Sequence, residues 1–110
     1  MLSKIKVYGR VQGVLFRKNV KEFADKIGIK GSVRNCADGS VEIIAQGSED
    51  KIKKLYHWIK SNPGFSKIDE IAAEDLKTNV NYEDFEILKN GNYFQDKKKA
   101  LGNFKRSLHN

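Results

Sequence analysis

The spacing of apolar residues changes along this chain in a way that leaves few folds open to it. Apolar residues recur three or four positions apart in two segments, residues 16–27 and the segment between Ser48 and Asn62, which is typical of amphipathic helices. Other segments alternate apolar with polar residues, as half-buried strands do. We predict strands at residues 3–8, 30–34, 41–46, within 67–76, and at 82–88. The predicted order is therefore β-α-β-β-α-β with a last strand.

Two amphipathic helices and an alternating set of strands bury their apolar surfaces best as two layers. We therefore predict an α+β protein with a ferredoxin-like sandwich, in which both helices lie on one face of an antiparallel sheet, followed by a C-terminal extension. Gly28 is expected to cap the first helix in a left-handed conformation, and Asp38-Gly39 predicts a hairpin turn. We also expect the first and second strands to be neighbours, so that the end of the first strand lies near Asn35.

The composition indicates one domain in a reducing compartment. The chain has 110 residues, 39% of them hydrophobic and 32% charged, and no apolar run approaches the ~18 residues of a membrane span. We see no signal peptide at the N-terminus, and the single cysteine, Cys36, rules out an intramolecular disulfide. We expect a cytoplasmic protein that contacts no membrane. With only His57, His109 and one cysteine, and no clustered ligands, we expect no metal site.

The basic charge is concentrated at the C-terminal end. The net charge is +7, but residues 1–88 have 15 basic and 13 acidic side chains, whereas residues 89–110 have six basic and one acidic. We expect residues 1–88 to form the folded domain and residues 89–110 to form a basic extension, interpreted as an extra helix. Self-association and contact with RNA or another acidic partner remain alternatives for this extension. Nucleic acid is otherwise not an expected partner, because the domain itself is nearly balanced in charge.

The segment that joins the first strand to the first helix has features of an anion-binding site. Two glycines allow a tight turn, the helix N-terminus offers unpaired N–H groups, and Arg17 adds a fixed charge on the first helical turn. The spacing of Gly9 and Gly13 fits neither the nucleotide P-loop nor the dinucleotide-binding turn, so a plain turn with a solvated arginine stays open on spacing alone. The candidate phosphate cradle is the backbone of Gly9, Arg10, Val11, Gln12, Gly13, Val14 and Leu15.

Two extended motifs resemble the signature of the acylphosphatase family, over a region from about Ile5 to Leu88. The first runs from Gly9 to Arg17, and the second is Gly31-x-Val33-Arg34-Asn35-x-x-Asp38-Gly39-Ser40-Val41-Glu42. The resemblance implies a hydrolase that splits small-molecule acyl phosphates into a carboxylate and inorganic phosphate by direct attack of water. It implies that Arg17 holds the phosphoryl group and that Asn35 positions the water, without metal or cofactor. We expect the protein to be a monomer and to be inhibited by its product, inorganic phosphate.

Two other functions remain to be weighed against this one. A non-catalytic RNA-binding module could use the same kind of sheet and the basic tail, but such modules need aromatic residues on central strands, and residues 41–46 contain none. A domain that binds an acyl phosphate without turnover is a third alternative. Ser32 and Cys36 stand where many relatives have tryptophan and threonine, which affects packing or substrate fit near Asn35 rather than the residues assigned the chemistry.

Overall fold

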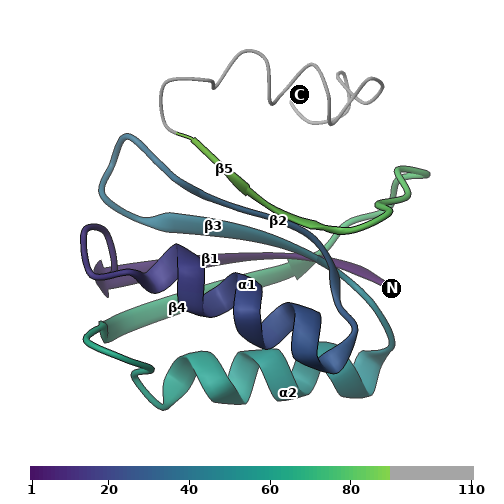
Figure 1. The fold of residues 1–110 in the computed structure, drawn as a ribbon. Helices are drawn as coiled ribbons and strands as arrows, with labels where there is room; N and C mark the ends of the chain where they lie inside the picture. Colours follow the sequence, from purple (N-terminus) through teal and green to yellow (C-terminus); the bar gives the residue numbers. More distant parts are fainter. Residues whose placement is uncertain (90–110) are drawn as a thin grey trace.

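The computed structural model describes residues 1–89, and these form a two-layer α+β sandwich (Figure 1). Their elements are β1 (Leu2–Arg10), α1 (Phe16–Ile27), β2 (Lys30–Asn35), β3 (Val41–Gln46), α2 (Glu49–Lys60), β4 (Lys67–Asp75) and β5 (Phe85–Leu88). The predicted ferredoxin-like order is confirmed. The extension predicted for residues 89–110 lies, apart from Lys89, outside the described residues.

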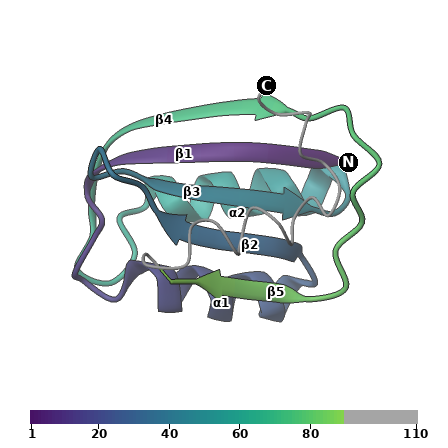
Figure 2. The same cartoon turned by 90° about the horizontal axis from the view of Figure 1, so that it is seen from above.

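The strands form one sheet in the order β4-β1-β3-β2-β5 (Figure 2). β1 pairs antiparallel with both β3 and β4, and β3 pairs antiparallel with β2. The expectation that the first two strands are neighbours was wrong, because β3 lies between them. A helix is about twice as wide as the spacing between strands, so the crossover through α1 leaves room for one strand. β1 and β2 nevertheless run in the same direction, and their C-terminal ends meet at the same end of the sheet.

β5 extends this sheet on its β2 side. It pairs parallel with β2, from Gly31 opposite Phe85 to Arg34 opposite Leu88. The sheet is therefore mixed rather than wholly antiparallel as predicted. Phe85 is buried in the core, whereas Ile87 is 37% exposed. The short parallel strand brings the end of the described chain to the side of α1.

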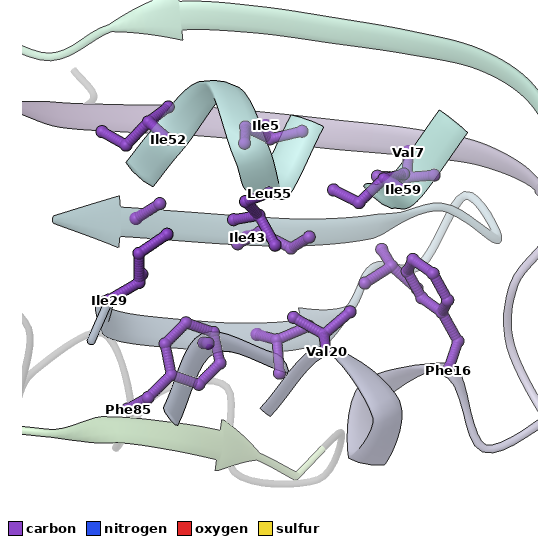
Figure 3. Packing of buried hydrophobic residues seen from close by; sticks show 14 of the residues in the cluster. Ile5, Val7, Phe16, Val20, Ile29, Ile43, Ile52, Leu55, Ile59 and Phe85 are labelled. Atoms are coloured by element: carbon purple, nitrogen blue, oxygen red, sulfur yellow. The ribbon is translucent and has the colours of Figure 1, made fainter. Parts of the chain in front are cut away.

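Both helices cover the same face of the sheet and bury their apolar stripes against it (Figures 1 and 3). Fully buried side chains include Phe16 of α1 and Leu55 of α2, each of which stabilises the fold by about 1.5–3 kcal/mol relative to exposure. The rings of Phe23 and Trp58 stack with their centroids 4.6 Å apart, which joins the two helices. The rest of the buried cluster is Ile5, Val7, Val11, Val20, Ala24, Ile29, Val33, Val41, Ile43, Ala45, Ile52, Ile59 and Phe85.

The ends of the helices follow the sequence signals. Gly28 has φ 83°, and its N–H donates to the Asp25 carbonyl, as expected of a left-handed cap. Ser48 caps α2, because its Oγ accepts a hydrogen bond of 3.2 Å from the N–H of Lys51. Neither helix is long and apolar enough to cross a membrane, as judged over residues 1–89.

Candidate active site

Residues 11–15 connect β1 to α1, and two valines anchor them to the core. Val11 is fully buried, and Val14 packs against the buried cluster. Between and after these anchors the backbone turns through positive φ angles, 75° at Gly13 and 64° at Leu15. Leu15 is an uncommon residue for that conformation, and its side chain is 64% exposed. The loop is therefore fixed at two points and strained where it enters the helix.

The two glycines of the first motif have different surroundings. Gly9 lies within β1 at φ 132°, and a Cβ at this position would lie 2.2 Å from the carbonyl oxygen of Lys67. Its lack of a side chain serves the close contact between β1 and β4. Arg10, also in β1, pairs with Lys67. At Gly13 a Cβ would meet no atom within 4 Å among residues 1–89, so this part of the loop faces open space.

The N-terminus of α1 carries an uncompensated positive end of the helix dipole. Residues 16–19 include no acidic side chain, and within the described chain Leu15 provides no side-chain cap. Arg17 and Lys18 add positive charge to the same turn. In α2, by contrast, Ser48 caps the first turn and two acidic residues follow it. Among residues 1–89, no side chain therefore caps the N–H groups at the start of α1, an arrangement that favours an anion there.

Arg17 is held by the end of β5. Its Nη1 donates a hydrogen bond of 2.9 Å to the carbonyl oxygen of Leu88, and its side chain is half-buried. A guanidinium has five N–H donors, so this contact fixes the plane of the group and leaves donors for a ligand. Arg17 thus combines a fixed orientation with spare hydrogen-bonding capacity.

Asn35 is the last residue of β2 and pairs with Val41 across the hairpin. Its Oδ1 is buried and accepts no hydrogen bond from any of residues 1–89. An unsatisfied buried acceptor costs about 1–3 kcal/mol, so such groups normally have a partner. Within residues 1–89, the Oδ1 of Asn35 therefore lacks the donor that a buried acceptor normally has.

The hairpin turn that follows Asn35 is held by its own side chains. Asp38 accepts hydrogen bonds through Oδ1 from the backbone N–H of Ser40, at 3.0 Å, and from the Ser40 hydroxyl. Lys6 places its Nζ 3.4 Å from the other carboxylate oxygen. The bonds from Ser40, with a smaller contribution from Lys6, hold the pKa of Asp38 below its ordinary value.

A side chain of the loop connects these two motifs. Nε2 of Gln12 donates to the carbonyl oxygens of Cys36 and Ser40, both at 2.9 Å. The expected convergence of the end of β1 with the hairpin is thereby confirmed, although the strands are not neighbours. From the sequence we predict a role only for the backbone of Gln12. The signal that its side chain takes part is its position as a polar residue between two anchoring valines. No feature of the sequence indicates the role of Leu88, because only its backbone carbonyl takes part.

The other reactive side chains among residues 1–89 form no recognisable catalytic group. Cys36 is a free, half-buried thiol, and His57 is exposed on α2 with its ring 6.1 Å from that of Tyr56. Among residues 1–89, no three His, Cys, Asp or Glu side chains are grouped so that they could hold a metal ion.

A known protein family matches most of this chain. The model of the family described as Acylphosphatase matches residues 3–87, which include both motifs and all described strands except the last residue of β5 and the first of β1. The chain belongs to the acylphosphatase family.

Individual relatives give the same result. The chain is 39% identical over 79 residues to an acylphosphatase of Marinobacter nauticus, a match that covers 72% of this chain and 86% of the relative. The crystal structure of an acylphosphatase from Bacillus subtilis superimposes with a TM-score of 0.75 at 38% identity, covering 80% of this chain and 99% of that one. An acylphosphatase structure from Coxiella burnetii gives a TM-score of 0.74 at 31% identity, covering 79% and 90%.

Proposed function

We propose that this protein hydrolyses small-molecule acyl phosphates to a carboxylate and inorganic phosphate by direct attack of water on phosphorus. Family membership supports the reaction class. The observation that carries the proposed mechanism is the buried Oδ1 of Asn35, which has no donor among residues 1–89 and lies at the same end of the fold as Arg17 and the N-terminus of α1.

The phosphoryl group is bound by Arg17 and by backbone N–H groups of residues 9–15 and the start of α1. Phosphoryl transfer needs mainly positioning and stabilisation of charge on the equatorial oxygens. The guanidinium supplies parallel, charge-assisted hydrogen bonds through the donors that its contact with Leu88 leaves available. Backbone donors are already oriented before charge develops and need no reorganisation.

Asn35 orients the attacking water. Its Oδ1 accepts a hydrogen bond from the water, which satisfies the buried acceptor and aims an oxygen lone pair at phosphorus. An amide cannot act as a base, so the proton of the water goes elsewhere, and the substrate phosphate is the acceptor in our proposal. The leaving carboxylate has a pKa of about 4 and leaves without a strong general acid. The mechanism therefore needs no histidine, cysteine nucleophile or metal ion.

The same proposal covers location and assembly. A single cysteine supports a cytoplasmic location, because the protein then has no need of an oxidising compartment. Arg17, Asn35 and the loop of residues 11–15 come from one chain, which supports a monomer as the active unit. Inorganic phosphate, the product, binds the same cradle and inhibits competitively. No comparison favours the RNA-binding alternative, which we set aside.

Hydrolysis of benzoyl phosphate in the presence of a chelator tests this proposal. We expect turnover by the wild type, a loss of about 10³-fold or more in kcat/KM for Arg17→Ala, and a loss of about 10²–10³-fold for Asn35→Ala. Asn81→Ala, at an exposed asparagine, is the control and should change kcat/KM by less than about twofold. Phosphate binding without turnover would instead favour the non-catalytic alternative. Full activity of both variants would overturn the assigned roles, and loss of activity on chelation would overturn the metal-free mechanism.

A further inference from the structure

The side-chain amide of Gln12 joins the candidate cradle to the hairpin that carries Asn35. Its Nε2 donates to the carbonyl oxygens of Cys36 and Ser40, each at 2.9 Å, although these residues are 24 and 28 positions away in the sequence. An amide NH₂ group has two hydrogens, so each carbonyl can receive one of them. The side chain is half-buried, so water competes weakly for these bonds.

The two acceptors lie at the base of the hairpin turn. The N–H of Cys36 donates to the Ser40 carbonyl at 2.8 Å, and the N–H of Gly39 donates to the Cys36 carbonyl at 3.1 Å. Asn35 and Val41, the pair of residues immediately outside this base, are opposite each other in the sheet. Gln12 therefore bonds both sides of the hairpin turn, at the residue after Asn35 and at the residue before Val41.

We propose, on the basis of the function proposed above, that the Gln12 side chain is a positioning residue that keeps the Asn35 amide in line with the phosphate cradle. Arg17 and the loop N–H groups fix the phosphorus, whereas Asn35 fixes the water, and the two sets belong to different segments. The Gln12 amide is the described side-chain contact that spans them directly. A misplacement of about 1 Å between a catalytic group and its substrate costs about 10²-fold in rate.

The chemistry of this contact distinguishes three substitutions. Methionine has nearly the length of glutamine but no donor, so Gln12→Met removes both hydrogen bonds with little change in volume. Gln12→Glu places a carboxylate, which is an acceptor only, against two carbonyl oxygens. When that carboxyl is protonated it regains one O–H donor and can restore one of the two bonds.

Gln46 offers a matched control. Its side-chain amide also makes two hydrogen bonds to backbone, from Nε2 to the Tyr82 carbonyl at 3.2 Å and from the Tyr82 N–H to Oε1 at 2.8 Å. Gln46 is the last residue of β3, whereas Val41, next to the hairpin, is the first. Gln46→Met therefore removes a comparable number of bonds far from the hairpin.

Steady-state hydrolysis of benzoyl phosphate, measured with inhibition by inorganic phosphate, tests the inference. We expect kcat to fall about 10–100-fold in Gln12→Met while the inhibition constant of phosphate changes less than about threefold. Gln46→Met should lower the unfolding temperature and leave kcat within about twofold of the wild type. The ratio of Gln12→Glu to wild-type kcat should rise as the pH falls toward about 4, while that of Gln12→Met stays constant.

The possible failures can be told apart. If the wild type is active and Gln12→Met keeps its kcat, the inference fails and the proposed function stands. Equal losses of kcat and phosphate affinity, with no recovery of Gln12→Glu in acid, would show a general structural role and also overturn the inference. If the wild type does not hydrolyse benzoyl phosphate, the proposed function fails and the inference falls with it.

Discussion

The guanidinium of Arg17 donates a hydrogen bond of 2.9 Å to the carbonyl oxygen of Leu88, 71 residues further along the chain. Leu88 is the last residue of β5, which is held in the sheet by its parallel pairing with β2. The strand that closes the described domain thus also orients the side chain assigned to the phosphoryl group. Only the backbone of Leu88 is needed for this contact, so its side chain is free to vary.

In the proposed mechanism Arg17 bonds Leu88 and binds the phosphoryl group at the same time, which predicts that lysine cannot replace it. An ammonium that donates to Leu88 cannot also grip two phosphate oxygens in the parallel manner of a guanidinium. We expect Arg17→Lys to lower kcat/KM by about 10²-fold or more even though the charge is retained. Lys54→Ala, at an exposed position on α2, should change it by less than about twofold. Near-wild-type activity of Arg17→Lys with benzoyl phosphate would show that charge alone suffices.

Backbone strain in the loop predicts opposite effects of two neighbouring substitutions on stability. Leu15 has φ 64° with a side chain that is 64% exposed, so Leu15→Asn relieves strain and loses little burial. We expect a gain of about 0.5–1 kcal/mol in the free energy of unfolding. Gly13→Ala, at φ 75° where no atom of residues 1–89 would contact the added Cβ, should lose about 1 kcal/mol for conformational reasons alone. Urea denaturation measures both, and changes of the same sign would contradict this account.

The lowered pKa of Asp38 predicts how the hairpin responds to acid. Hydrogen bonds from Ser40 and the charge of Lys6 favour the ionised carboxyl in the folded state. Its contribution to stability is therefore present above the ordinary pKa of about 4 and is lost as the pH falls through the lower folded value. Asp38→Asn keeps an acceptor oxygen but cannot titrate. We expect the stability difference between wild type and this variant to shrink between neutral pH and pH values below about 4. A difference that is constant with pH in urea denaturation would refute the assignment.

The basic tail is not needed for catalysis in this account. A chain that ends at Lys89 keeps β5 and the carbonyl that Arg17 contacts. We expect this truncated protein to hydrolyse benzoyl phosphate within about twofold of the full chain and both proteins to sediment as monomers. A larger mass for the full chain alone would indicate self-association through the tail. Binding of a single-stranded RNA by the full chain alone would indicate a nucleic-acid contact there.

The secondary structure could be predicted more fully than the arrangement of the strands. The spacing of Phe16 and Val20 and the cap at Gly28 determine α1 locally, and Ser48 does the same for the start of α2. The position of β3 between β1 and β2 could not be predicted in this way, because alternation within a strand reports which face is buried and not which strand is next. The parallel pairing of β5 could not be predicted, for the same reason.

The candidate site could also be predicted only in part. Arg17 and Asn35 could be named from the two motifs, because the family resemblance attaches roles to residue types at fixed spacing. The contacts that orient them could not be named. Gln12 bonds two backbone carbonyls and Arg17 bonds a third, and carbonyls are present at every position of any sequence. Such contacts depend on the folded path of the chain.

The most direct test of the central claim, attack of water on phosphorus, is hydrolysis of benzoyl phosphate in ¹⁸O-labelled water with a chelator present. The enzyme should place the label in inorganic phosphate and not in benzoate, at the first turnover as well as later ones, and Asn35→Ala should slow this labelling in proportion to its loss of kcat. Label in benzoate would mean attack on the carbonyl carbon. A first turnover that yields unlabelled benzoate together with a trapped phosphorylated protein would contradict direct attack by water.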